Sequence, residues 1–131
     1  MKTLIVEDDF TSRLFLQEAL KAYGACHIAV NGEEAVEAVR MALEKDEPYD
    51  LICLDIMMPE MDGQEALKKI RTQEEDSGIS SSTGAKILMT TALGDLQNVS
   101  AAYRGLCDGY LVKPISKASL LEELQKHGLP F

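Results

Sequence analysis

Polar side chains that could act together in chemistry follow four short apolar runs of this 131-residue sequence. They are Glu7, Asp8 and Asp9 after the first run, Asp55 after the second, Thr90 and Thr91 after the third, and Lys113, with Pro114 next to it, after the fourth. In open α/β sheets, functional groups collect at the carboxyl ends of the strands. We therefore expect carboxylates, a hydroxyl and an ammonium group at one edge of a sheet.

The carboxylates alone would repel one another in such an arrangement. With an effective dielectric constant of about 20, each pair of like charges costs roughly 4 kcal/mol at about 4 Å. A shared proton or a bound hard dication can offset this repulsion, and carboxylate and water oxygens suit Mg²⁺. We favour Mg²⁺, because a dication, the ammonium group of Lys113 and a hydroxyl around Asp55 match what phosphoryl transfer requires. Asp55 would then be the nucleophile that forms an acyl phosphate.

Each of these residues, taken alone, also has a simpler structural interpretation. Asp9 precedes a predicted helix, so we interpret it as the N-cap of that helix. Thr91 would be an ordinary hydroxyl at a strand end, and Lys113 a solvated charge. Tyr110 would be a packing residue, and Met57 flexible apolar filler near a loop. The joint placement of the polar residues is what favours a functional site.

The elements that must position these residues alternate along the chain. Short apolar runs without alternation indicate strands that are buried on both faces of a parallel sheet. The predicted strands are Thr3 to Val6, Leu51 to Leu54, Ala85 to Thr90, Tyr110 to Val112 and, with a weaker pattern, Cys26 to Val30. The predicted helices, from apolar spacings of three and four, are Phe10 to Tyr23, Glu33 to Lys45, Gly63 to Glu75, Asp95 to Leu106 and Lys117 to Lys126. This order predicts a doubly wound α/β domain with a parallel sheet.

One stretch fits neither pattern. The segment Glu74 to Gly84 (EEDSGISSSTG) is polar and rich in Ser and Gly, so we expect an exposed, mobile loop before the fourth predicted strand. The last predicted helix ends five residues before Phe131. We therefore expect a single domain over residues 1–131 without an appended output domain.

Composition excludes several classes of protein. With 46% apolar residues the chain can bury a core. It has 13 basic and 22 acidic residues, a net charge of −9, and because nucleic-acid binding depends on cationic side chains we do not expect a nucleic-acid surface. The sequence has neither an apolar run long enough to span a membrane nor a charged-then-apolar leader at Met1, so we expect no membrane insertion and a cytoplasmic location. Cys26, Cys53 and Cys107 are widely spaced among apolar neighbours, which is typical of reduced, buried thiols.

Four motifs resemble those of one known family. The segments LIVEDD, LICLDIMMPEMDG, ILMTTA and GYLVKP follow one another in the order found in the receiver domain of bacterial two-component response regulators. The resemblance covers nearly the whole chain, and it is closest to stand-alone receivers such as the chemotaxis regulator. It implies a (βα)5 flavodoxin-like fold with a five-stranded parallel sheet in the order 2-1-3-4-5.

The resemblance also implies roles for the acidic residues. Asp55 resembles the phosphoacceptor, and Asp8 the carboxylate that ligates Mg²⁺ directly. Glu7 would complete the acidic pair through water, and Met57 would offer its backbone carbonyl to the metal. An alternative register would use Asp8 and Asp9, but counting from the apolar residues LIV places Glu7 and Asp8 at the two positions of the family.

Further roles follow from the same resemblance. Thr91 resembles the switch hydroxyl that closes on the phosphoryl group, Lys113 the cation that pairs with a phosphoryl oxygen, and Tyr110 the aromatic residue that moves between outward and inward positions. The Lys113–Pro114 bond is expected to be cis. Met57 and Leu93 are apolar where many receivers carry polar side chains, which leaves the lifetime of the phosphorylated state open.

The implied function is that of a signalling switch. A histidine kinase or a phosphotransfer protein would donate the phosphoryl group, and the surface from about Asp95 to His127 (helix 4, strand 5 and helix 5) would change for a downstream protein partner. The chain would work as a monomer or as a phosphorylation-dependent dimer, without contacting nucleic acid directly. It would catalyse its own phosphoryl transfer and dephosphorylation and would not act as a stand-alone enzyme.

Four alternatives remain to be weighed. A phosphatase of the haloacid dehalogenase type expects a second Asp two residues after the nucleophile, where this chain has Met57. A flavodoxin needs a phosphate-binding loop after the first strand, where this chain has EDDF. A pseudo-receiver would lack some of the motif residues, which are all present here. The chain could also be the receiver part of a larger hybrid histidine kinase.

Overall fold

A computed structural model describes residues 1–58, 61–80, 83–92, 94–95 and 105–130 of the chain. Its five strands form one parallel sheet in the order β2-β1-β3-β4-β5. The strands are β1 (Thr3–Val6), β2 (Cys26–Ala29), β3 (Leu51–Asp55), β4 (Lys86–Ala92) and β5 (Gly109–Lys113). The predicted flavodoxin-like strand order is therefore confirmed.

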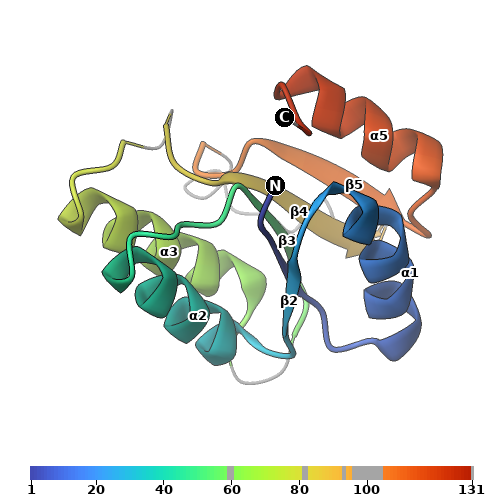
Figure 1. Ribbon diagram of the computed structural model, residues 1–131. Coiled ribbons are helices and arrows are strands. Elements are labelled where there is room, and N and C mark those ends of the chain that lie inside the picture. Colours follow the sequence, from blue (N-terminus) through green and yellow to red (C-terminus); the bar gives the residue numbers. More distant parts are fainter. Residues whose placement is uncertain (59–60, 81–82, 93, 96–104, 131) are drawn as a thin grey trace.

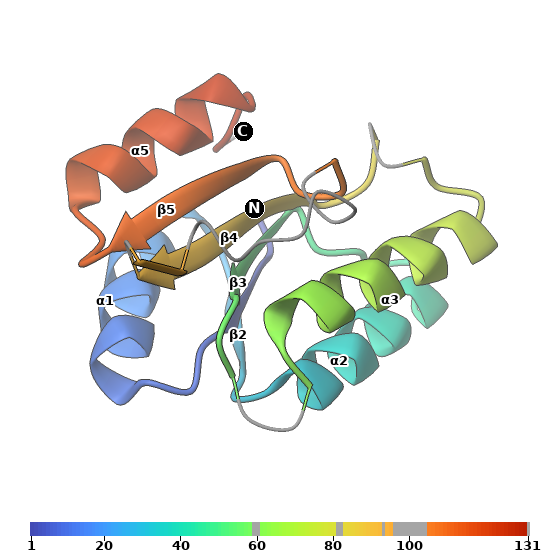
Figure 2. The same cartoon turned by 180° about the vertical axis from the view of Figure 1, so that it is seen from behind.

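Helices cover both faces of this sheet. The described helices are α1 (Phe10–Leu20), which continues into the 3-10 helix η1 (Lys21–Tyr23), α2 (Gly32–Glu44), α3 (Gly63–Asp76) and α5 (Lys117–Lys126). α2 and α3 lie on one face, and α1 and α5 lie on the other (Figures 1 and 2). The predicted helix Asp95 to Leu106 falls largely on residues 96–104, outside the described part of the chain.

The core consists of two apolar clusters, one on each face of the sheet. Ile52 and Leu54 of β3 belong to the cluster under α2 and α3, whereas Leu51 and Cys53 belong to the cluster under α1 and α5. Every residue of β3 is buried. A central strand that is covered on both faces must be apolar at successive positions, which explains why it shows no alternation in the sequence.

The helices begin close to the carboxyl ends of the strands, and side-chain caps fix where they begin. The N-cap residues Asp9, Asn31, Asp62 and Ser116 each accept a hydrogen bond from the backbone N–H three residues later. These bonds satisfy N–H groups that have no partner within the helix. The predicted N-cap role of Asp9 is thus confirmed.

The prediction of an exposed loop from Glu74 was wrong for its first residues. α3 continues through Asp76, and Glu74 is 4% exposed. Its carboxylate accepts hydrogen bonds from Nη1 of Arg71, at 2.6 Å, and from the backbone N–H of Ala85, at 2.8 Å. Glu74 can be buried because it has these charged and polar partners, which lie beside the start of β4. Residues 81–82 of the predicted loop lie outside the described part of the chain.

The prediction of three buried thiols is confirmed for one residue. Cys53 is buried, and burial raises the pKa of its thiol to about 12. Cys26 and Cys107 are half-buried, so the prediction was wrong for these two. The edge position of β2 leaves Cys26 partly open to solvent. None of the described helices is both long and apolar enough to cross a membrane.

Candidate functional site

Three carboxylates meet where β1 and β3 end. In the sheet, Val6 pairs with Leu54, so Glu7 and Asp55, the next residues, lie side by side. Glu7, Asp8 and Asp55 each offer an oxygen within 4.8 Å of the others. We call these three residues the acidic cluster. Asp8 is exposed, whereas Glu7 and Asp55 are 0% and 4% exposed, so two of the charges lie out of contact with water.

Lys113 at the end of β5 faces the acidic cluster. Its Nζ atom lies 2.9 Å from Oε2 of Glu7 and 3.3 Å from Oδ2 of Asp55, and its side chain is 24% exposed. The predicted meeting of carboxylates and an ammonium group at one edge of the sheet is therefore present. The Lys113–Pro114 bond is cis, as the resemblance implied.

The charges of the site do not cancel. Burial raises the pKa of Asp55 to about 7, and its hydrogen bond to Glu7 and the charge of Glu7 act in the same direction, against the opposing effect of Lys113. Burial lowers the pKa of Lys113, but its bonds to Glu7 and the charge of Asp55 outweigh this effect, and the pKa is raised overall. The charged form of Asp55 is therefore disfavoured beside Glu7, and a bound cation would favour it.

The acidic cluster fits a hard divalent cation. Mg²⁺ binds carboxylate oxygens and keeps several water molecules, and the exposed side of Asp8 is where such waters could lie. The backbone N–H of Met57 donates to Oδ1 of Asp55 at 3.2 Å, which holds the chain after β3 against the carboxylate. The proposed metal contact of the Met57 carbonyl stays a prediction.

Asp9 does not point into the acidic cluster. Its side chain accepts from the backbone N–H of Ser12 at 2.9 Å, and its hydrogen bonds with Ser12 lower the pKa of Asp9. Its own N–H donates to Oε1 of Glu7 at 3.2 Å. This geometry favours the register in which Glu7 and Asp8 form the acidic pair.

Thr91 and Tyr110 lie on β4 and β5, next to the site. Thr91 is 1% exposed, and its hydroxyl donates to the backbone carbonyl of Ala92 at 3.1 Å. Tyr110 is half-buried, with its hydroxyl shielded from solvent, and packs against the cluster under α2 and α3. Thr91 directly follows Thr90, the sheet partner of Asp55, and Tyr110 pairs with Met89. The switching roles of both residues stay predictions.

Sequence reasoning missed the structural role of Gly63. Its N–H donates to the carbonyl of Ile56 at 2.9 Å, which closes the loop that leads from Asp55 to α3. A Cβ atom at Gly63 would lie 2.2 Å from the backbone oxygen of Asp55 and 2.7 Å from Cα of Ile56. The Asp62-Gly63 pair was visible in the sequence, but the close approach of the backbone was not.

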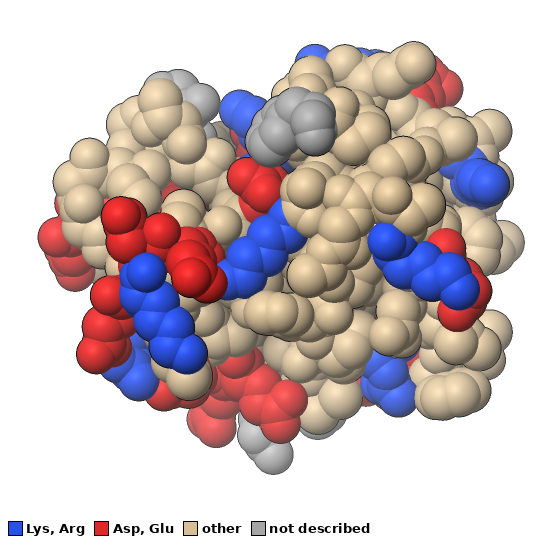
Figure 3. All heavy atoms as spheres, viewed as in Figure 1, with Lys and Arg blue, Asp and Glu red and all other residues tan. Residues whose placement is uncertain are grey.

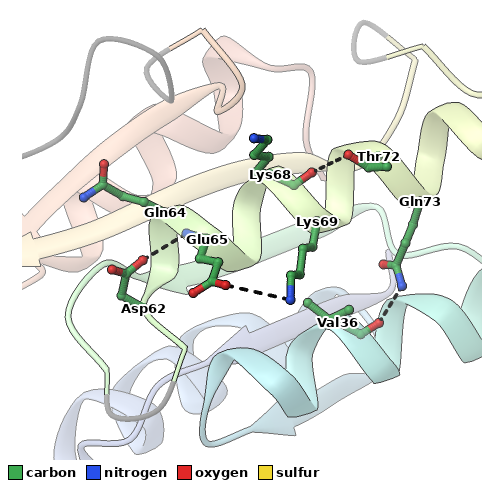
Figure 4. Close-up of a pocket in the computed structure, with 8 residues that line it drawn as sticks. All are labelled: Val36, Asp62, Gln64, Glu65, Lys68, Lys69, Thr72 and Gln73. Carbon is green, nitrogen blue, oxygen red and sulfur yellow. Dashed lines mark hydrogen bonds and ion pairs between the residues drawn. The ribbon is translucent and has the colours of Figure 1, made fainter.

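One groove lies away from this chemistry. It has a volume of about 720 Å³ and follows α3, with Val36 of α2 beside it, and the residues that line it include neither the acidic cluster nor Lys113 (Figure 4). Across it, Gln73 donates to the carbonyl of Val36 at 3.1 Å, and Lys69 lies 3.8 Å from Glu65. On the face shown in Figure 3, acidic side chains gather beside α2, and basic side chains lie singly among them.

The fold and the site define a flavodoxin-like α/β domain with a cation-binding acidic cluster, and the comparisons specify its family. The model of the response regulator receiver domain matches residues 3–125. The chain is 36% identical over 123 residues to the chemotaxis protein CheY of Halobacterium salinarum, with 94% of this chain and 92% of that protein covered. The chain therefore belongs to the response regulator receiver domain family and is a protein of two-component signalling.

Solved structures agree with this assignment. The receiver domain of the sensor histidine kinase PA1611 from Pseudomonas aeruginosa, solved with a magnesium ion coordinated in its active site cleft, gives a TM-score of 0.76 at 26% identity, covering 97% of each chain. The co-crystal structure of the Saccharomyces cerevisiae histidine phosphotransfer protein Ypd1 and the receiver domain of Ssk1 gives a TM-score of 0.79 at 30% identity, covering 98% of this chain and 88% of that one.

Proposed function

We propose that the protein is a phosphorelay switch in which Asp55 accepts a phosphoryl group from a phosphohistidine. The observation that supports this most directly is the acidic cluster with the ammonium of Lys113 within 3.3 Å of Asp55. A carboxylate nucleophile, a place for a divalent cation and a fixed ammonium group are the parts that phosphoryl transfer needs.

The transfer exchanges one bond to phosphorus for another. A carboxylate oxygen of Asp55 attacks the phosphorus atom, the P–O bond forms, and the P–N bond to the donor imidazole breaks. The bonding pair leaves with the imidazole nitrogen. Lys113 stabilises the negative charge on the phosphoryl oxygens. Asp8 and Asp55 would hold Mg²⁺ directly, with Glu7 through water and the carbonyl of Met57, and the bound dication would supply further positive charge at the same place.

The new phosphoryl group would act on Thr91 and Tyr110. The hydroxyl of Thr91 leaves the carbonyl of Ala92 for a phosphoryl oxygen, and Tyr110 packs further inward as Thr91 moves. These moves bias a pre-existing equilibrium between two conformations. The surface of β5, α5 and the segment before β5 then changes for a downstream protein partner.

In this proposal a sensor histidine kinase or a phosphotransfer protein donates the phosphoryl group. The chain works in the cytoplasm as a stand-alone receiver over residues 1–131. It is a monomer or a phosphorylation-dependent dimer. CheY, 92% of which is covered by the alignment, supports the stand-alone form. The receiver of the histidine kinase PA1611 supports the second candidate, a receiver that belongs to a hybrid kinase. The protein transfers the group to itself and has no separate substrate to turn over.

The test is incubation with acetyl phosphate and Mg²⁺, followed by intact mass measurement beside the Asp55→Asn variant. The expected result is a gain of about 80 Da, the mass of one phosphoryl group on a carboxylate nucleophile. The gain should require Mg²⁺ and be absent from Asp55→Asn. If neither an adduct nor beryllofluoride binding is found with the wild-type chain, the proposal is wrong.

A further inference from the structure

Thr90 carries a buried hydroxyl that has no evident use. The residue is 1% exposed, and within the described part of the chain its Oγ1 atom has no hydrogen-bond partner. A buried hydroxyl without a partner loses its bonds to water and gains nothing in return, and such groups are rare in native proteins. A valine would fill the same space without this cost.

The register of the sheet places this hydroxyl beside the nucleophile. Thr90 on β4 pairs directly with Asp55 on β3, so both side chains point to the same face of the sheet. Successive residues of a strand point to opposite faces, so the side chain of Thr91 starts from the other face. Thr90 is therefore the threonine that shares a face with Asp55.

Lys113 must pass above Thr90 to reach its partners. Lys113 pairs with Ala92, two residues after Thr90, and β4 lies between β5 and β3. Neighbouring strands are about 4.8 Å apart, so a side chain that starts on β5 and contacts Asp55 at the end of β3 crosses β4. The hydroxyl of Thr90 lies beneath the path of this side chain.

Lys113 directs its ammonium group at the carboxylates in this structure. Its Nζ atom donates to Oε1 of Glu7 at 3.2 Å and to Oδ2 of Asp55 at 3.3 Å, and it lies 2.9 Å from Oε2 of Glu7 as an ion pair. An ammonium group has three N–H donors and no acceptor. Within the described part of the chain, Thr90 receives none of them.

We infer that Thr90 is a positioning residue for Lys113 in the cation-loaded state. When the oxygens of Glu7 and Asp55 turn toward Mg²⁺, Lys113 has an N–H to spare, and the hydroxyl of Thr90 accepts it. The ammonium group then stays above Asp55, where the phosphoryl oxygens arrive. This inference rests on the proposed function, since it assumes that the acidic cluster binds Mg²⁺.

Two substitutions at this position separate the hydroxyl from the shape of the side chain. Thr90→Val keeps the shape and removes the hydroxyl, whereas Thr90→Ser keeps the hydroxyl. The control is Thr3→Val, which changes another buried threonine, 1% exposed, at the far end of β1. For each protein we would measure the melting temperature in EDTA, the Mg²⁺ dissociation constant by calorimetry, and the rate of adduct formation with acetyl phosphate.

We expect Thr90→Val to be more stable than the wild type without Mg²⁺ but to bind Mg²⁺ more weakly. In EDTA, Thr90→Val melts higher than the wild type, because it removes an unpaired buried group. In Mg²⁺, Thr90→Val binds the cation about tenfold more weakly, the size of one hydrogen bond to a charged group, and forms the adduct more slowly. Thr90→Ser and Thr3→Val keep the Mg²⁺ affinity of the wild type.

Equal Mg²⁺ affinities of Thr90→Val and the wild type would overturn the inference, as would a loss of affinity in Thr90→Ser as large as that in Thr90→Val. The proposed function is judged separately, by whether the wild type forms an adduct at all. A wild type that binds Mg²⁺ tightly but gains no phosphoryl group would contradict the proposed function and leave the affinity test of Thr90 intact.

Discussion

The Nζ atom of Lys113 lies 2.9 Å from Oε2 of Glu7, a fully buried carboxylate 106 residues earlier in the chain. Lys113 also contacts Asp55, so one ammonium group serves two buried acids. Removing it should leave both acids without their ion-pair partner, which is more damaging than the loss of a surface ion pair. This relationship can be tested by substitution.

We expect Lys113→Met to lower the free energy of unfolding by roughly 2 kcal/mol in EDTA at pH 8, less than for a fully buried pair because Lys113 is partly exposed. Urea denaturation measures the difference, and added Mg²⁺ should reduce it. Lys126→Met is the control, since Lys126 pairs with Glu123 at the surface and should contribute less than about 1 kcal/mol. Equal losses in the two variants would contradict this account of the site.

Asp55→Asn should change how stability depends on pH. The pKa of Asp55 is raised to about 7 from 3.8, so the folded protein holds this proton more tightly than the unfolded chain does. The resulting stability is present below about pH 4 and is lost as the pH rises to about 7. In EDTA above pH 7, the free energy of unfolding of Asp55→Asn should therefore exceed that of the wild type by a few kcal/mol at most. The variant should accordingly unfold at a higher urea concentration.

Melting curves at pH 5 and pH 8 check this prediction. The advantage of the variant should be larger at pH 8, and saturating Mg²⁺ should stabilise the wild type more than Asp55→Asn. A variant that is less stable than the wild type at pH 8 without metal would show that Lys113 offsets the charge of Asp55 completely.

Gly63→Ala should destabilise the loop that carries Asp55. Its Cβ atom would lie 2.2 Å from the backbone oxygen of Asp55, and backbone cannot move aside as a flexible side chain can. We expect a loss of about 2 kcal/mol or more, together with a lower Mg²⁺ affinity. Gly94→Ala is the matched control, because nothing lies within 4 Å of its Cβ position. If Gly63→Ala keeps both the stability and the Mg²⁺ affinity of the wild type, the loop is not as tightly packed as described.

Arg71→Leu should cost more than most substitutions of charged residues. Arg71 is 3% exposed and donates to Glu74, to Asp108 and to the carbonyls of Ala85 and Leu106. Its loss leaves two carboxylates without their cation, and we expect a loss of about 3–5 kcal/mol in urea denaturation.

Arg40→Leu provides the contrast for Arg71. Arg40 bonds to Glu37 and Glu44 on α2, but its side chain is 51% exposed, so its loss should lower the free energy of unfolding far less than the loss of Arg71. Similar losses in the two variants would mean that burial does not set the value of the Arg71 network.

The sequence was sufficient to predict the sheet and the edge at which the site lies. Strands buried on both faces appear as unbroken apolar runs, and polar residues directly after such runs must come to the same edge. Lys113 and Asp55 are 58 residues apart in the sequence, and this reasoning predicted that they meet at the same edge of the sheet. The predicted strands β1 and β3 agree with the structure to within one residue.

Such sequence patterns could not predict the hydrogen-bond network of Arg71. Arg71 and Glu74 are three residues apart, a spacing that is common on exposed helix faces. What distinguishes them is burial beside Asp108, 37 residues further along the chain, and this is decided by tertiary packing. Thr90 is a similar case. Two threonines precede the last residue of β4, and the sequence does not tell which of them shares a face with Asp55 until the register is known.

The position of β5 at the edge of the sheet has a consequence for the synthesis of the protein. Among the described strands β5 is synthesised last, and Lys113 is its final residue. Before that strand docks on β4, a nascent chain already has the carboxylates of β1 and β3 but lacks the ammonium group of Lys113 that faces them. The proposed phosphoryl transfer needs that ammonium group, so it also needs β5 to be docked.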